Sequence, residues 1–123
     1  MIRYVDHVGI TVQDLEQSIA FYAKLGFAVV RRQATATHEI AFVRNGLAEL
    51  ELFAPKTGVP GPAPTLHEDT IQHIAFHVDA IDDAVATLEG RGISFTSAVR
   101  RTGNRAGVLF KDPDGTLLQL LQG

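Results

Sequence analysis

The chain lacks cysteine altogether, carries little excess charge and has no long run of hydrophobic residues. Without cysteine no disulfide can form, which is typical of a reducing compartment. The 14 acidic and 11 basic side chains give a formal charge of −3, which provides no basic surface for nucleic acid. No segment approaches the roughly 18 apolar residues that a membrane-spanning helix needs, and the first residues resemble no secretion signal. We therefore expect a cytoplasmic protein that binds neither nucleic acid nor membrane.

What the chain does have is a unit that occurs twice. Shifted by 66 residues, segment 6–12 falls on segment 72–78. Farther along the shift becomes 68 residues and aligns two pairs of apolar positions in each repeat. These pairs are Ile40 and Phe42 with Val108 and Phe110, and Leu50 and Leu52 with Leu118 and Leu120. The chain 1–123 is thus expected to be a single domain of two repeats, about 1–54 and 71–123, joined by a Pro/Gly-rich linker at 55–70.

Each repeat predicts the same order of elements, β-α-β-β-β. Apolar residues alternate at 8–12 and 74–78, as in a strand with one buried face, and then recur at three- and four-residue spacing, as in an amphipathic helix. Asp14 and Asp82 suit the helix starts, and Gly26 and Gly92 suit the helix ends. Further strands are expected at 27–33, 38–45 and 47–53, and at 93–100, 105–111 and 116–122.

The fold class that follows is α+β. Two βαβββ modules in tandem form a curved mixed sheet around a concave metal or ligand cavity, with the helices on the outside. Strand alternation indicates which side chains face away from the helices. They are His7 and His73 in the first strand of each repeat, and Glu51 and Gln119 in the last strand.

These four side chains offer two imidazoles, one carboxylate and one amide. Such a mixed set of nitrogen and oxygen donors suits a divalent metal ion (Ni, Co, Zn, Mn or Fe) and leaves coordination positions for a substrate. A single histidine on a strand is more often structural. What favours a metal site is that both histidines, and both polar residues of the last strands, occupy matching positions in the two repeats.

Four segments resemble the vicinal oxygen chelate superfamily, and together they span nearly the whole chain. They are Asp6–Val12, Leu50–Phe53, Gln72–Asp79 and Asp112–Leu120. The superfamily includes glyoxalase I, methylmalonyl-CoA epimerase, bleomycin-resistance proteins and extradiol dioxygenases, and this chain is most similar to the small glyoxalase-like members. The resemblance is more specific for the fold than for the reaction, because members share the scaffold and differ in chemistry. It also implies a homodimer, since relatives are commonly dimers.

The resemblance implies that the four residues named above are the metal ligands. Glyoxalase I and the dioxygenases usually have Glu at the fourth position, so Gln119 departs from their pattern. Glu51 is then both a ligand and the catalytic base that abstracts a proton next to a carbonyl. Help from Glu49 or His77 stays open, and so does the choice between one-base and two-base transfer.

The expected function is a metal-dependent lyase or isomerase of the glyoxalase type. Such an enzyme chelates vicinal oxygens of a small substrate and moves a proton next to a carbonyl. Two alternatives stay open. One is a metal-free small-molecule (antibiotic) binding protein, against which the near-complete ligand set argues. The other is an Fe(II) extradiol-type dioxygenase, in which two histidines and Glu51 hold the iron.

Overall fold

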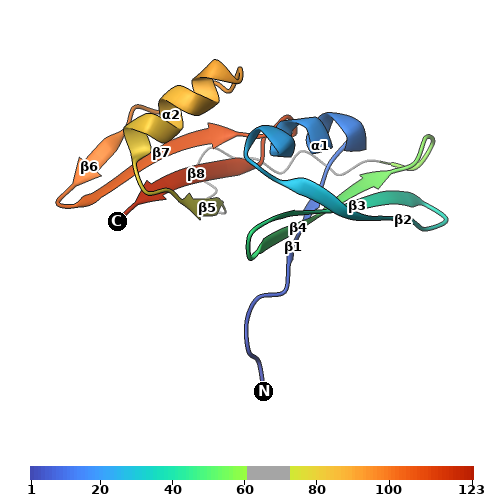
Figure 1. Cartoon of the computed structure of the whole chain (residues 1–123). Coiled ribbons are helices and arrows are strands. Elements are labelled where there is room, and N and C mark those ends of the chain that lie inside the picture. The colour runs from blue at the N-terminus through green and yellow to red at the C-terminus, as the bar shows by residue number, and fades with distance from the viewer. Residues whose placement is uncertain (61–72) are drawn as a thin grey trace. The chain divides into compact units, whose positions relative to one another are not determined.

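The computed structural model describes residues 1–60 and 73–123, which form two compact units (Figure 1). Each unit contains one helix and one four-stranded sheet. Most of the expected linker lies outside the described residues, and its first residue, Pro55, ends a strand. Neither described helix is long and apolar enough to cross a membrane.

The two units have the same order of elements. The first consists of β1 (Val8–Thr11), α1 (Leu15–Lys24), β2 (Ala28–Ala34), β3 (His38–Asn45) and β4 (Ala48–Pro55). The second consists of β5 (Ile74–His77), α2 (Ile81–Gly90), β6 (Arg100–Thr102), β7 (Arg105–Lys111) and β8 (Leu117–Gln122). The sheets are ordered β1-β4-β3-β2 and β5-β8-β7-β6, and in each the first pair is parallel and the other pairs are antiparallel. The predicted tandem of βαβββ modules is confirmed, and each helix covers one face of its own sheet (Figure 1).

Both helices begin and end where the sequence predicts, but their first turns are capped differently. The side chain of Asp14 accepts a hydrogen bond from a backbone N–H in the first turn of α1 at 3.0 Å. Helix α2 has no such local cap. Instead Oε1 of Gln122, in β8, accepts a hydrogen bond from the backbone N–H of Ile81 at 2.8 Å. Gly26 and Gly92 follow the helices with φ of 92° and 88°, a backbone region that glycine adopts without strain.

Apolar side chains between each helix and its sheet form the core of each unit. In β4, Leu50, Leu52 and Ala54 are buried and the residues between them are half-buried. Leu118 and Leu120 are buried in the same way in β8. Burying a leucine side chain contributes roughly 1.5–3 kcal/mol, so this alternation decides which face turns to the helix. The opposite face, here named the open face, carries the candidate polar side chains together with apolar ones such as Phe42.

The prediction of a strand at 93–100 is wrong, because the regular strand in this region is β6, Arg100–Thr102. Before β6, this segment contributes only an isolated bridge between Phe95 and Phe110. The Oγ atom of Ser97 accepts a hydrogen bond from the backbone N–H of Leu109 at 3.0 Å. A serine hydroxyl that bonds the backbone in this way competes with regular strand pairing. The outer strand β6 is therefore only three residues long.

The shift of 68 residues holds for β4 and β8, but for β3 and β7 it is wrong by one residue. Phe42 pairs with Glu51, on the open face. The residue that pairs with Gln119 in the second unit is Leu109. Phe110, which the shift aligns with Phe42, is instead fully buried on the helix side.

An extra residue in the second turn causes this difference. Two residues, 46–47, connect the last paired residues of β3 and β4. Asp112 donates its backbone N–H to the carbonyl of Thr116 across the second turn, and this pair encloses three residues. Because side chains alternate along a strand, a change of one residue in register exchanges the two faces.

Candidate functional site

The open face of the first unit carries the side chains that the alternation predicts. His7 immediately precedes β1, and Glu51 lies in β4, where it pairs with Gly9. The Oε1 atom of Glu51 lies 3.5 Å from the position that a Cβ atom on Gly9 would take. The carboxylate of Glu51 therefore extends over β1, the strand that His7 leads into.

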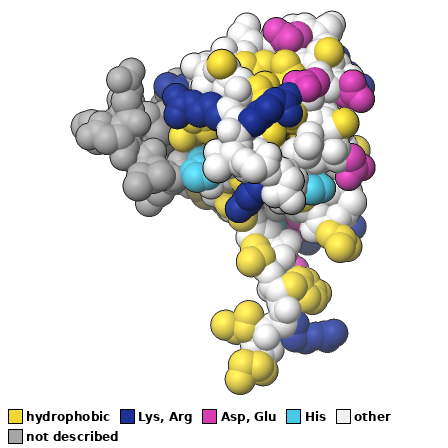
Figure 2. All heavy atoms as spheres, turned by 90° about the vertical axis from the view of Figure 1, so that its left-hand side faces the viewer, with side chains coloured by type: hydrophobic (Ala, Val, Ile, Leu, Met, Phe, Trp, Pro, Cys, Tyr) yellow, Lys and Arg dark blue, Asp and Glu magenta, His cyan; other side chains and the backbone are white. Residues whose placement is uncertain are grey.

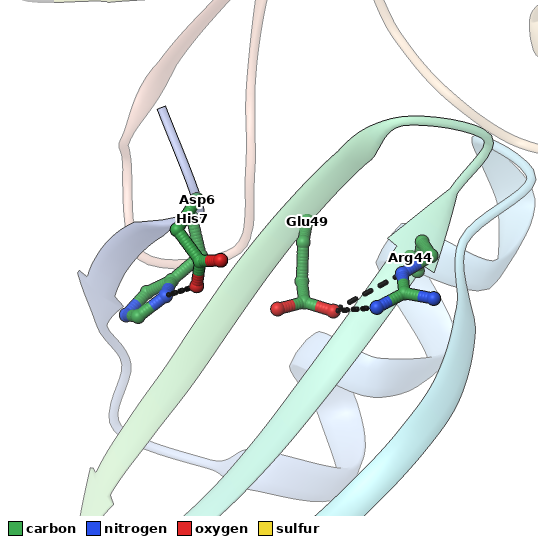
Figure 3. Close-up of polar contacts among 4 residues, drawn as sticks. All are labelled: Asp6, His7, Arg44 and Glu49. Atoms are coloured by element: carbon green, nitrogen blue, oxygen red, sulfur yellow. Dashed lines mark hydrogen bonds and ion pairs between the residues drawn. The ribbon is translucent and has the colours of Figure 1, made fainter. Parts of the chain in front are cut away.

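His7 is held by a carboxylate that the sequence analysis did not single out. Its Nδ1 atom lies 2.8 Å from Oδ2 of Asp6 (Figure 3), and its ring packs edge-on against Phe42, with the centroids 5.4 Å apart. The hydrogen bond to Asp6 raises the pKa of His7 above its ordinary value. Burial opposes this rise, and the charge of Glu51 adds to it. A histidine bonded through Nδ1 keeps Nε2 for a metal or a substrate.

Glu49 lies close to the same histidine. Potential ligand atoms of Asp6, His7 and Glu49 all lie within 4.8 Å of one another (Figure 3). Oε1 of Glu49 also accepts hydrogen bonds from Nη2 and Nε of Arg44, at 2.7 and 3.1 Å. In contrast, Glu51 forms no salt bridge with any residue in the described ranges 1–60 and 73–123. Since Glu49 is paired with Arg44, Glu51 is the more available carboxylate for a cation.

One row of side chains crosses the open face of the first unit. Gly9 pairs with Glu51, Glu51 pairs with Phe42, and Phe42 pairs with Arg31. The guanidinium carbon of Arg31 lies 4.2 Å from the centroid of the Phe42 ring. Strand alternation predicted the place of Glu51 in this row, and the roles of Phe42 and Arg31 were not predicted. Asp6 was also missed, although its position directly before His7 was a usable signal.

The second unit places its two candidates in the corresponding positions. His73 immediately precedes β5 and is exposed, and Gln119 lies in β8, where it pairs with Ala75. The Nε2 atom of Gln119 lies 3.0 Å from the position that a Cβ atom on Gly107 would take. The amide therefore extends over β7, away from the strand that follows His73. Coordination of one ion by His7, Glu51, His73 and Gln119 stays a prediction.

Two other polar residues of the second unit have partners nearby. Nε2 of His77 lies 3.6 Å from Oδ1 of Asp79, and both side chains are exposed. Nη2 of Arg101 lies 2.7 and 2.6 Å from the two carboxylate oxygens of Asp82, so β6 is tied to the first turn of α2. The geometry gives both side chains carboxylate partners within the second unit.

This architecture, with candidate ligands on the open faces, defines a class of proteins to which the chain can be compared. Residues 4–120 match the family described as the Glyoxalase/Bleomycin resistance protein/Dioxygenase superfamily, and the chain belongs to this superfamily. The resemblance noted from the sequence is confirmed. Members of the superfamily bind small molecules, often hold divalent metals and often form oligomers, and some of them are enzymes.

Three individual proteins illustrate the relationship. The chain is 33% identical to YwkD, an uncharacterized protein of Bacillus subtilis strain 168, over 99% of this chain and 98% of that protein. It is 31% identical to the mitochondrial methylmalonyl-CoA epimerase of Homo sapiens, over 96% of this chain and 73% of that protein. Its fold is similar to that of FosX, a fosfomycin resistance protein of Listeria monocytogenes crystallised with Mn(II) and sulfate. The TM-score is 0.75 at 19% identity, covering 100% of this chain and 94% of FosX.

Proposed function

We propose that the protein is a metal-dependent lyase or isomerase that moves a proton next to a carbonyl group of a small molecule. The observation that carries this proposal is the arrangement on the open face of the first unit. Asp6 orients the ring of His7, and the carboxylate of Glu51 extends over the same strand without a salt-bridge partner among the described residues. The 31% identity to a methylmalonyl-CoA epimerase supports it, because epimerisation next to a carbonyl is itself a proton transfer.

The proposed metal ligands are His7, Glu51, His73 and Gln119, and the ion is one of Ni, Co, Zn, Mn and Fe. Imidazole nitrogen and carboxylate oxygen are donors that these ions accept. A carboxylate that bonds the second ring nitrogen of a metal-binding histidine is a common supporting arrangement, and Asp6 fits it. The Mn(II) in FosX supports a metal in this fold. When bound, the ion stabilises the negative charge that develops on the carbonyl oxygen of the substrate.

Glu51 performs the proton transfer in this proposal. The C–H bond next to the carbonyl breaks, the proton moves to the carboxylate of Glu51, and the electron pair moves toward the carbonyl oxygen. Glu51 then returns the proton to the same or the adjacent carbon. Gln119 occupies the matching position in the second unit, and an amide cannot take up a proton, so one base serves both half-reactions. A positioned base typically accelerates such a step by about 10²–10⁴-fold.

The proposal includes a homodimer in the cytoplasm. Residues 1–5 extend away from the sheet of the first unit, and their apolar side chains are on the surface (Figure 2). Met1, Ile2, Tyr4 and Val5 are each more than 70% exposed, and a second copy of the chain would cover such a segment. Sedimentation velocity of the purified chain tests this part, and a single monomeric species across the concentration range would contradict it.

Metal content is the first test of the function. The purified full chain is incubated with Ni, Co, Mn and Zn, freed of unbound ions and analysed for metal. About one equivalent per chain is expected, and His7→Ala and Glu51→Gln should each lower it. His77→Ala is the matched control, because this histidine pairs only with Asp79 among the described residues and should leave metal content unchanged. A wild-type chain that stays metal-free would overturn the proposal and favour the binding protein.

Proton transfer is the second test. Methylmalonyl-CoA is incubated with the metal-loaded protein in D2O, and deuterium entering next to the thioester carbonyl is followed by mass spectrometry. Exchange by the wild type and its loss in Glu51→Gln are the expected results. Oxygen consumption with catechol and Fe(II), without proton exchange, would instead identify a dioxygenase.

A further inference from the structure

A β-bulge in β2 changes the face to which the residues after it belong. Val29 pairs with Val43 on the helix side, and the next pair is Arg31 with Phe42 on the open face, so Val30 is an extra residue. Without this insertion Val30 would oppose Phe42, and Arg31 would turn to the helix side. Bulges are frequent next to active sites, where they redirect a side chain.

Two adjacent arginines show the consequence. Arg32, on the helix side, binds Glu16 of α1 through two contacts of 2.6 and 3.2 Å. Arg31, on the open face, forms no salt bridge with any described residue. Arg44 and Arg101, by comparison, each have a carboxylate partner. The bulge thus leaves one guanidinium without an anion on the face that carries Glu51.

The Phe42 ring fixes this guanidinium. The guanidinium carbon lies 4.2 Å from the ring centroid, a distance typical of a cation–π contact. The N–H donors of this guanidinium form no salt bridge with any described residue. Those donors form a planar fork that matches the two oxygens of a carboxylate or phosphoryl group. Because Phe42 is buried and also contacts His7, Arg31 is held against the same ring as this candidate ligand of the first unit.

We infer that Arg31 binds an oxyanion of the substrate, a carboxylate or a phosphoryl group, and so selects anionic small molecules. Arg31 and Glu51 are two strands apart in one row, roughly 10 Å between their Cα atoms. A substrate of a few bonds in length spans this distance, with its reacting carbon at Glu51 and its anionic group at Arg31. The term substrate rests on the proposed function, whereas anion binding by Arg31 is independent of it.

The test is titration of the full chain with inorganic phosphate and, separately, with acetate, at constant ionic strength. Binding is followed by NMR through the backbone amides of β2 and β3 and the arginine Nε–H signals, with and without Zn²⁺. Arg31→Met keeps the aliphatic cover over Phe42 but removes the charge, and should weaken binding about tenfold or more. Arg32→Met is the matched control, because it removes the same charge one residue away on the helix side, and its affinity should equal that of the wild type.

A second variant tests the geometry of the contact. Arg31→Lys keeps the charge without the fork, so it should bind both anions more weakly than the wild type and more tightly than Arg31→Met. Equal affinity of wild type and Arg31→Met for both anions would overturn the inference. Metal content separates this result from a failure of the proposed function. If the chain binds anions through Arg31 but holds no metal, the inference about Arg31 stands and the proposed metal-dependent enzyme is contradicted.

Discussion

The two units have one topology but different open faces. Glu51 of the first unit corresponds to Gln119 of the second, and Phe42 corresponds to Leu109. The carboxylate of Glu51 extends over β1, toward the strand that His7 leads into, whereas the amide of Gln119 extends over β7. Duplication therefore kept the apolar alternation that each core requires and left the polar identity of the open face free to change. The carboxylates of the last strand, Glu49 and Glu51, lie in the first unit, and the second unit has Leu117 and Gln119 in their place.

The outer strands differ even more than the inner ones. Strand β2 has seven residues and a bulge, and β6 has three residues. Each is tied to its helix by one arginine–carboxylate pair, Arg32 with Glu16 and Arg101 with Asp82. On the open face, β2 places Arg31 opposite Phe42, whereas β6 begins at Arg100, opposite Gly107, and does not reach Leu109, the counterpart of Phe42. The extra length of β2 thus coincides with the proposed anion contact.

Exchanging the polar residues of the last strands should have the largest effect. Glu51→Gln gives the first unit the side chain of the second, and it should lower proton exchange by about 100-fold or more. The other carboxylate on this face of β4, Glu49, is paired with Arg44 and does not replace it. Gln119→Glu should leave exchange within about tenfold of the wild type, since Glu51 is intact. Both rates come from the deuterium assay. Equal losses in the two variants would show that the units share the chemistry equally.

Matched leucines test whether the two cores contribute equally to stability. Leu52 and Leu120 are both buried on the helix side of the last strand. Leu52→Ala and Leu120→Ala should each lower the free energy of unfolding by about 2–5 kcal/mol. Leu47→Ala, at a fully exposed turn position, should change it by less than about 0.5 kcal/mol. Urea denaturation measures all three, and a small loss in only one of the buried variants would mean that its core repacks more easily.

The spacing of apolar residues predicted the strand faces on which the candidate residues lie. The alternation of Leu50 and Leu52 with Glu49 and Glu51 is a direct consequence of burying one face of a strand, so it can be seen in the sequence. The helix ends could also be predicted, because Gly26 adopts a positive φ that other residues avoid. These features depend on local chemistry, which a single sequence contains.

Register between strands could not be predicted in the same way. The bulge at Val30 follows from pairing with β3, and nothing in two consecutive valines and two consecutive arginines indicates which arginine turns to the open face. The extra residue before Thr116 also changes the face of a whole strand without changing its apolar content. The sequence therefore identified Glu51 but missed Arg31, which depends on contacts between distant segments.

The two units also differ in how the first turn of the helix is capped. Asp14→Ala removes a local cap from α1, and Gln122→Ala removes a cap that β8 supplies to α2. Each should lower the free energy of unfolding by about 1 kcal/mol. Gln17→Ala, at an exposed helix position, serves as the control and should change it by less than about 0.5 kcal/mol. Thermal and urea denaturation provide the values. No change for Gln122→Ala would mean that solvent satisfies this helix end as well as the side chain does.

The smallest expected effect concerns the pKa of His7. Its hydrogen bond to Asp6 is the main cause of the raised pKa, so Asp6→Asn should lower the pKa toward the ordinary histidine value. Glu49→Gln should lower the pKa less, because Glu49 acts only through its charge and contributes least to the rise. An NMR titration of the imidazole signals of the metal-free chain measures both shifts. The sign for stability follows: protonated His7 stabilises the fold below its unfolded pKa, and this contribution is lost as the pH rises through the folded pKa. If Asp6→Asn left the pKa unchanged, Asp6 would not orient the ring in solution, and the raised pKa of His7 would have to come from the charges of Glu51 and Glu49.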